Sequence, residues 1–192
     1  AQLERNLRLT VDWNCQALAL SEIFQRDDYT QIEIKHNVFE NAILKLDREE
    51  FIELFLDQGF YIHRYLGRNN IRDLFLKAEN REFFVTIVLQ RLLGHFTSDL
   101  PENFLPDGLN DVLKELTQID QVINILEIYM NQLGFYVIDA KTAERKALNF
   151  LIIYAVIFNR HKLAKTLWKR TEDPLPVALV CSIIYKNLVQ YC

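Results

Sequence analysis

The chain has 192 residues, of which half are apolar and a quarter are charged, with only five Gly and four Pro. This is the composition of a globular protein and excludes a disordered chain, and so few Gly and Pro favour helices over a many-stranded β fold. The net charge of −4 excludes a chain that is basic throughout, as nucleic-acid-binding proteins often are.

Apolar residues recur at helical spacing along most of the chain. We predict helices near residues 3–25, 34–46, 48–57, 69–78, 81–95, 107–117, 119–132, 140–158, 160–169 and 174–190. Gly59 and Gly134 follow two of these helices, at the position where a positive φ is favoured. Asp173-Pro174 is typical of a helix N-cap and first helical residue. Residues 98–108 form the clearest predicted loop, and residues 135–138 an extended connection or a buried helix end.

The longest apolar run covers residues 147–158 and contains Asn149. A helix needs about 20 apolar residues to cross a bilayer, so this run predicts a buried core helix and not a membrane span. The sequence begins at Ala1 with no signal peptide, and we expect it to be a fragment of a longer protein.

One pattern occurs three times, as TVDWNCQALALSEIF, AILKLDREEFIELFL and YAVIFNRHKLAKTLW. Each copy has an apolar helix, a polar turn and a second helix, with Asn14, Asp47 and Asn159 at equivalent positions. Four residues later stand Leu18, Phe51 and Leu163. A weaker fourth copy begins at Asn80, and positions 14, 47 and 80 are spaced by the period of ankyrin repeats. The step from 80 to 159 breaks that period, so we expect an interruption around residues 98–118.

The pattern predicts helical hairpins that stack, because one hairpin alone cannot bury its apolar face. The Asn or Asp at each turn is expected to cap the second helix, and the Arg or Glu that follows is expected to face solvent. The predicted fold is therefore all-α, with stacked antiparallel hairpins of ankyrin-like or α-solenoid type. The whole of 1–192 is expected to be a single helical-repeat domain or fragment. Its parts are hairpins near 3–25, 34–60, 69–96 and 140–170, the loop 98–108 and a C-terminal helix over 174–190. The predicted structural turn residues are Asn14, Asp47, Arg48, Asn159 and Arg160.

Aromatic residues at helical spacing predict a packed core and not a ligand pocket. The residues concerned are Phe83, Phe84, Phe150, Tyr154, Phe158 and Trp168. Trp13 is equivalent to Phe158 in the repeat, which predicts a packing role for it as well.

The sequence lacks the residue patterns that are typical of catalytic or metal-binding sites. The four His have no metal-ligand spacing, and no phosphate-binding glycine loop or nucleophile elbow occurs. Asp27-Asp28 and Glu49-Glu50 are neighbours that point in different directions, which favours solvated turns over an acid–base pair. The three Cys are widely spaced, which suits a reducing compartment. We therefore expect no enzyme, no metal and no cofactor.

Charge is unevenly distributed. Residues 1–140 carry 13 Lys/Arg and 23 Asp/Glu, whereas residues 141–170 carry 8 and 1. The candidate interaction face comprises Arg160, Lys162, Lys165, Lys169 and Arg170. Its alternatives are a solvated outer face or a contact with an acidic neighbouring subunit or an anionic lipid surface; nucleic acid is disfavoured because aromatic residues are not interleaved with the charges.

Four segments in order resemble the melastatin-type transient receptor potential channels. These are LRLTVDWNCQALALSEIF (7–24), FENAILKLDREEFIELFLDQGF (39–60), LNFLIIYAVIFNRHKLAKTLW (148–168) and ALVCSIIYKNL (178–188). Cys15 departs from the Arg that this family favours after Asn14, and residues 61–140 match poorly.

The resemblance implies a non-catalytic part of the cytoplasmic N-terminal homology region of a homotetrameric cation channel. Its role would be subunit assembly and coupling of N-terminal sensing to the pore, on the cytoplasmic side of the membrane. The alternative is a free-standing ankyrin-like adaptor that binds protein partners, with which the 33-residue spacing is equally compatible. A third possibility, an all-α enzyme, has no catalytic constellation to support it.

Overall fold

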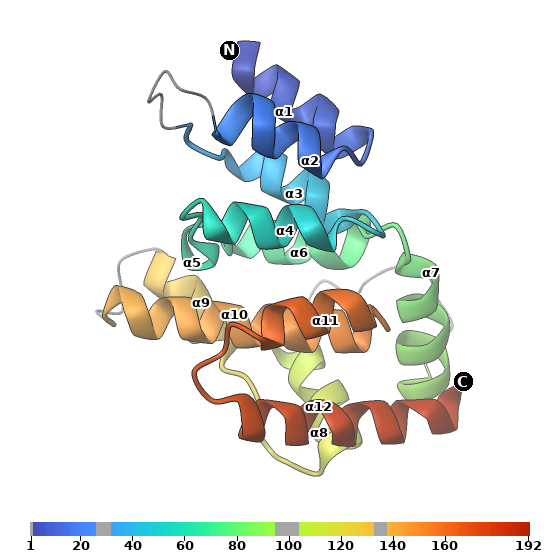
Figure 1. Ribbon diagram of the computed structural model, residues 1–192. Helices are drawn as coiled ribbons and strands as arrows, with labels where there is room; N and C mark the ends of the chain where they lie inside the picture. The colour runs from blue at the N-terminus through green and yellow to red at the C-terminus, as the bar shows by residue number, and fades with distance from the viewer. Residues whose placement is uncertain (1, 26–31, 95–103, 133–137) are drawn as a thin grey trace. The chain divides into compact units, whose positions relative to one another are not determined.

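The computed structural model describes residues 2–25, 32–94, 104–132 and 138–192 (Figure 1). Within these ranges all regular structure is helical and no strand occurs, which confirms the all-α prediction. The chain divides into two compact units, residues 1–61 and residues 62–192. No helix within the described ranges is long and apolar enough to cross a membrane.

The first unit contains two helix pairs. Its helices are α1 (Gln2–Asp12), α2 (Gln16–Ala19) with a π-helical continuation (Leu20–Phe24), α3 (His36–Leu44) and α4 (Glu49–Asp57). Helix α3 packs on both α1 and α4, and α2 also contacts α4. Buried side chains on the facing sides, among them Val11, Phe39 and Phe51, form the core of this unit.

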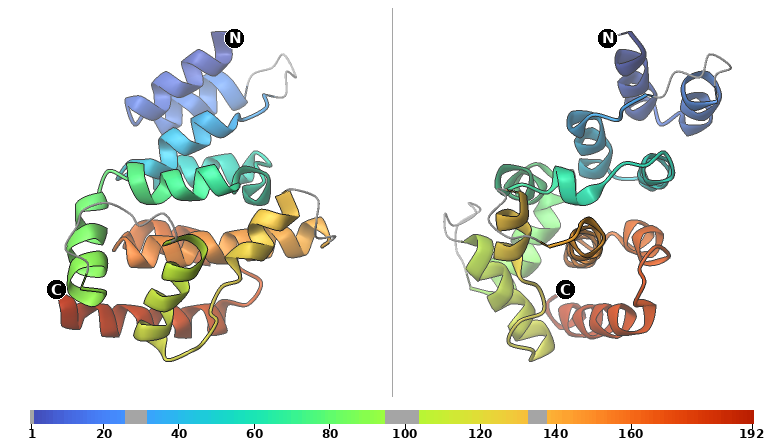
Figure 2. Two further views of the ribbon diagram at one scale, coloured as in Figure 1. Left: turned by 180° about the vertical axis from the view of Figure 1, so that it is seen from behind. Right: turned by 90° about the vertical axis from the view of Figure 1, so that its left-hand side faces the viewer.

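The second unit is built around one long helix, α10 (Ala140–Ile157) (Figure 2). Its other helices are α5 (Ile62–Tyr65), α6 (Arg68–Lys77), α7 (Arg81–Phe83) with a π-helical continuation (Phe84–Leu92), α8 (Leu109–Thr117), α9 (Ile125–Gln132), α11 (His161–Trp168) and α12 (Pro174–Leu188). Shorter elements are the turn Phe104–Gly108, which contains a non-helical residue, and the final 3-10 turn Val189–Tyr191.

Helix α10 is buried on all sides along its second half. Every residue from Phe150 to Ile157 is buried, and the helices α5, α9, α11 and α12 all contact α10. A helix that is apolar all round is a core helix, so the prediction from the apolar run is confirmed. Asp139 begins this helix as a true N-cap, because its carboxylate accepts the Thr142 backbone N–H at 2.9 Å.

An aromatic cluster fills the core of the second unit. Phe84 and Phe158 stack with ring centroids 4.9 Å apart, and Phe75 contacts both rings edge-on, at 5.3 and 5.5 Å. Tyr154 and Phe104 complete the cluster. Such pairs add about 0.5–1.5 kcal/mol each beyond their buried area.

Several predicted boundaries are wrong. The range 3–25 is not one helix, because the chain turns at residues 13–15. The helix expected over 119–132 begins only at Ile125, and α5 was not predicted. Helix α12 does begin with Pro174 at its first position, as expected. Gly134 and most of 135–138 lie outside the described residues, as do residues 98–103 of the predicted loop.

Candidate functional site

The predicted turn residues share one unusual backbone conformation. Asn14, Asp47 and Asn159 have φ of 57°, 54° and 56°, in the left-handed region that L-residues other than Asn and Asp rarely enter. Asn80, the turn residue of the weaker fourth copy, has φ −97° and lacks this conformation. The repeat therefore locates three turns that contain a left-handed residue, and the fourth copy is not of the same kind.

The first and third corners also share their hydrogen bonds. The Asn14 N–H donates to Val11 O at 3.2 Å, and the Cys15 N–H donates to Thr10 O at 2.9 Å. At the other corner the Asn159 N–H donates to Val156 O at 3.0 Å and the Arg160 N–H to Ala155 O at 2.7 Å. This pair of bonds is the Schellman motif, which satisfies the last carbonyls of a helix.

The role assigned to these residues was wrong in one respect. We expected the Asn or Asp side chain to cap the second helix, but the N-cap residues are Cys15, Arg48 and Arg160, and none makes a side-chain capping bond. Asn14 and Asn159 instead end the first helix through their backbone conformation, whereas α3 ends at the extended Lys45, two residues before Asp47. Gly59 does the same after α4, with φ 84°, as its position predicted.

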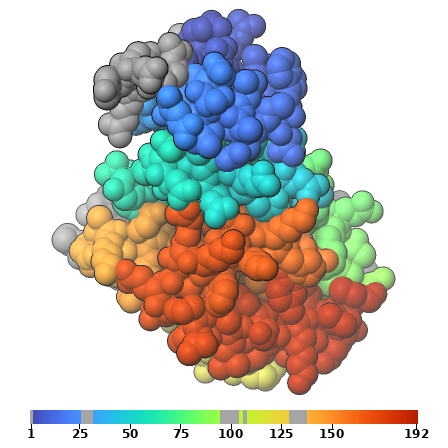
Figure 3. Space-filling model, in the orientation of Figure 1, coloured from blue at the N-terminus to red at the C-terminus, as the bar shows by residue number. Residues whose placement is uncertain are grey.

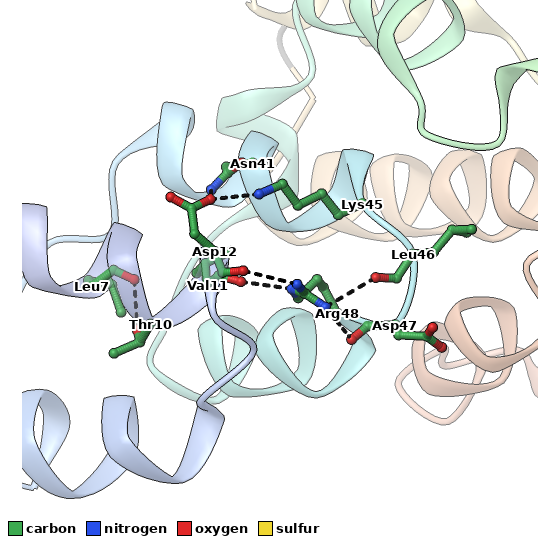
Figure 4. Close-up of polar contacts among 9 residues, drawn as sticks. All are labelled: Leu7, Thr10, Val11, Asp12, Asn41, Lys45, Leu46, Asp47 and Arg48. Atoms are coloured by element: carbon green, nitrogen blue, oxygen red, sulfur yellow. Dashed lines mark hydrogen bonds and ion pairs between the residues drawn. The ribbon is translucent and has the colours of Figure 1, made fainter.

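Arg48 ties the corner of one hairpin to that of the other within the first unit (Figure 4). Its Nε donates to Val11 O at 2.7 Å and its Nη2 to Asp12 O at 3.2 Å. Both carbonyls lie in the last turn of α1, where they have no partner inside the helix and where a cation is also favoured by the helix dipole.

Asp12 makes a second link between the same helices. Its carboxylate accepts from Asn41 Nδ2 at 2.8 Å and from Lys45 Nζ at 2.6 Å, both on or next to α3. The hydrogen bond from Asn41, and then that from Lys45, lowers the pKa of Asp12 below its usual value. Arg48 and Asp12 thus join α1, α3 and α4 through polar contacts at one end of the helices.

Arg160 is buried, with 4% of its surface exposed. The expectation that it faces solvent, as part of the candidate interaction face, is therefore wrong. Its guanidinium is a hydrogen-bond partner of the Tyr154 hydroxyl, which also donates to Leu74 O at 3.3 Å. Burial raises the pKa of Tyr154 to about 12, although the charge and hydrogen bond of Arg160 act in the opposite direction.

The remaining lysines of the candidate face lie on α11 or, for Lys169, directly after it. Lys162, Lys165 and Lys169 are exposed, while Leu163 and Leu167 on the opposite side of the helix are fully buried. Arg170 is half-buried. The predicted geometry of the face is correct for these lysines, and what the face binds stays a prediction.

One polar contact of the second unit was not foreseen. The Glu144 carboxylate, on α10, accepts the backbone N–H groups of Ile62 and His63, each at 2.9 Å, and lies 2.6 Å from His63 Nδ1. It thereby holds the beginning of α5. The periodicity of the sequence cannot predict this contact, because Glu144 lies 81 residues from His63 and 82 residues from Ile62 along the chain.

The candidate metal-binding and carboxylate residues of the sequence do not gather into one site in the described part of the chain. No group of three or more His, Cys, Asp and Glu side chains gathers there as metal ligands would. Glu49 and Glu50 lie in the first turn of α4, and Asp27-Asp28 lies outside the described residues.

The fold and these corners define a class of all-α proteins in which helix pairs turn at left-handed residues. Residues 85–191 match the TRPM2-like domain, and because this is more than half of the chain, the protein belongs to that family. The resemblance to melastatin-type channels is thereby confirmed.

The curated relatives are far longer than this chain. It is 24% identical to the transient receptor potential cation channel subfamily M member-like 2 of Nematostella vectensis, over 95% of this chain and 13% of that protein. It is 23% identical to subfamily M member 2 of Rattus norvegicus and 24% identical to that of Mus musculus, in each case over 96% of this chain and 14% of the relative. No solved structure matches the chain significantly.

Proposed function

We propose that this chain is a non-catalytic segment of a melastatin-type cation channel, on the cytoplasmic side of the membrane. There it would serve subunit assembly and couple N-terminal sensing to the pore. Membership of the family and the similarity to named subfamily M channels support the first part of the proposal.

The observation that carries the structural role is the repeated corner. A left-handed Asn or Asp lies in the turn after the first helix at three places, and Arg48 of one hairpin binds the terminal carbonyls of the other. Asn80 makes a related contact in the second unit, since its Nδ2 donates to Phe158 O beside the third corner. These contacts join neighbouring helix pairs side by side, and we infer that the hairpins stack as ankyrin-like repeats.

A rigid stack of this kind suits a lever or spacer better than an enzyme. Three polar side chains hold helices together through hydrogen bonds and leave no free catalytic group among them. These are Arg48, Asp12 and Arg160. The exposed lysines of α11 are the surface proposed to contact a neighbouring subunit of a homotetramer, by charge complementarity with its acidic regions.

The experiment is the mass of the chain in solution, measured by light scattering at several protein and salt concentrations. The proposal predicts an oligomer that dissociates as salt rises, because exposed charge contacts are screened. The variant Lys162→Glu/Lys165→Glu/Lys169→Glu should remove it while leaving the circular dichroism unchanged. Lys186→Glu, an exposed lysine on α12, is the matched control and should leave the oligomer intact. A monomer under every condition would contradict the assembly role.

A further inference from the structure

Helix α12 is strongly apolar but only partly covered. Its sequence is PLPVALVCSIIYKNL, yet only Ile184 and Leu188 are buried. Leu175 is 80% exposed and Leu179 is 64% exposed. Exposed apolar surface of this extent on one element marks an interaction site more often than a free surface.

A groove of about 380 Å³ runs between this helix and α11; side chains of both helices reach the surface in Figure 3, in orange and red. The wall from α11 consists of His161, Ala164, Lys165 and Trp168. These residues follow the spacing i, i+3, i+4, i+7, which is the face that a helix presents to a packing partner. The indole Nε1 of Trp168 donates to Pro174 O at 2.8 Å and so fixes the ring at the rim.

The wall from α12 has the same spacing, with Ala178, Cys181, Ser182 and Tyr185. Two helical walls with this pattern accept the side-chain ridge of a third helix. An apolar groove that receives the apolar face of an amphipathic helix is a recurring mode of peptide recognition. A bilayer surface offers no such ridge, so the shape favours a helix over a membrane.

Tyr185, which lines the groove, carries a buried polar atom. The Tyr185 hydroxyl is buried and has no hydrogen-bond partner among the residues that the structure describes. Burial of an unsatisfied hydroxyl is costly, and burial also raises the pKa of Tyr185 to about 12. The hydroxyl is enclosed by the chain itself, so it places no requirement on what binds in the groove.

The charge at the rim specifies the occupant further. Lys165 and Lys169 form no ion pair within the described ranges, whereas the carboxylates of the following loop are already engaged. Glu172 lies 2.9 Å from Lys141, and Asp173 lies 3.6 Å from Arg145. The α11 side of the groove is therefore positively charged, and an acidic partner complements it.

We propose that this groove binds an amphipathic helix of a partner protein. The apolar ridge of that helix fills the space between α11 and α12, and its Asp or Glu side chains face Lys165 and Lys169. Lys165 and Lys169 also belong to the face proposed for subunit assembly, so the two proposals are distinguished by Ser182→Phe, which changes the groove and leaves every lysine in place.

The experiment uses Trp168 as a reporter in the full chain. Trp13→Phe leaves Trp168 as the single Trp, and its fluorescence is followed on addition of a synthetic amphipathic helical peptide with Leu at i, i+3, i+4, i+7 and Glu beside them. We expect a saturable blue shift, because the indole loses water contact. A peptide with Lys in place of Glu should bind at least about tenfold more weakly, given the charge of the rim.

Two pairs of variants test the site. Ser182→Phe fills the groove while leaving every lysine in place, and it should weaken binding about tenfold or more; Lys186→Phe on the same helix should not. Lys165→Glu should weaken binding of the Glu peptide and improve binding of the Lys peptide, whereas Lys186→Glu should change neither by more than about twofold. Ser182 and Lys186 are exposed, so the substitutions leave the core unchanged.

The alternatives give different results. Absence of a saturable shift with the Glu peptide, or equal binding to the Ser182→Phe variant, would overturn the proposal. A shift with phosphatidylserine-containing vesicles but not with the peptide would overturn it in favour of a membrane surface. Self-association of the chain that Ser182→Phe abolishes would overturn it in favour of a second copy.

Discussion

Trp13 and Phe158 occupy the same position in two copies of one corner, directly before the left-handed Asn. Trp13 is 68% exposed, whereas Phe158 is fully buried and stacks on Phe84. The backbone conformation of the corner is thus set by local sequence, while burial is set by the helices that surround it. A repeat in sequence predicts equivalent geometry, and it does not predict an equivalent environment.

The largest expected effect on stability is the difference between truncating Phe158 and truncating Trp13. Phe158→Ala should lower the free energy of unfolding by about 3–5 kcal/mol, because it opens a cavity in the aromatic cluster. Trp13→Ala should change it by no more than about 0.5 kcal/mol, as is usual at the surface. Urea denaturation followed by circular dichroism measures both, and equal losses would show that the two corners have the same environment.

The comparison extends to the residues four positions beyond each corner. Leu163→Ala should cost about 2–5 kcal/mol, because Leu163 is fully buried. Leu18, which is 45% exposed, should tolerate Ala at a cost below about 1 kcal/mol. A loss below about 0.5 kcal/mol for Leu163→Ala would contradict the placement of α11 against α10.

Substitutions of Arg48 test how much the stability of the first unit depends on the hydrogen bonds between α4 and the end of α1. Arg48→Ala removes the donors to two terminal carbonyls of α1 and should cost about 1–3 kcal/mol. Arg48→Lys keeps the charge but lacks the planar guanidinium, so it should recover only part of that loss. Full recovery in thermal denaturation would mean that charge at the helix end, and not the pair of hydrogen bonds, provides the stability.

A substitution to Gly should raise the stability of the chain where the turn residue is left-handed, and lower it at Asn80, where the residue is not. Asn14→Gly and Asn159→Gly relieve a left-handed conformation and should stabilise by a few tenths to about 1 kcal/mol. Asn80 has negative φ and donates to Phe158 O, so Asn80→Gly should destabilise by about 1 kcal/mol. The same sign at all three positions would show that the fourth copy shares the corner after all.

The smallest effect is the pH dependence contributed by Asp12. Its pKa is lowered in the folded chain, so its stabilising contribution is complete above the unfolded value of about 3.9. That contribution is lost as pH falls through the lower folded pKa. Asp12→Asn should remove this part of the acid sensitivity in urea midpoints measured between about pH 5 and pH 2, and an unchanged profile would contradict the Asn41 and Lys45 contacts.

The sequence predicted those features of the fold that depend on residues close together in the chain. The apolar run that became α10, the turns at Asn14, Asp47 and Asn159, the positive φ of Gly59 and the first position of Pro174 are all of this kind. Each is set by periodicity or by backbone preference within a few residues.

Contacts between distant residues could not be predicted in the same way. The burial of Arg160, the exposure of Trp13 and the binding of α5 by Glu144 all depend on which helices surround each residue. The groove between α11 and α12 could not be predicted for the same reason. The sequence shows that a basic helix is followed by an apolar helix, but it does not show that one face of each helix lines the same groove.

The hydrogen bonds that hold α5, α6 and Asn80 in the second unit span more of the chain than those that join the helices of the first unit. In the first unit Asp12 and Arg48 connect residues 29 to 37 positions apart. In the second, the bonds from Glu144, Tyr154 and Asn80 connect residues 78 to 82 positions apart. At about 5–20 residues per second, a ribosome needs roughly 4 to 16 seconds to supply the partner of α5 and α6. We therefore expect the first unit to form its native contacts earlier during translation than α5 and α6, whose partners on α10 are synthesised later.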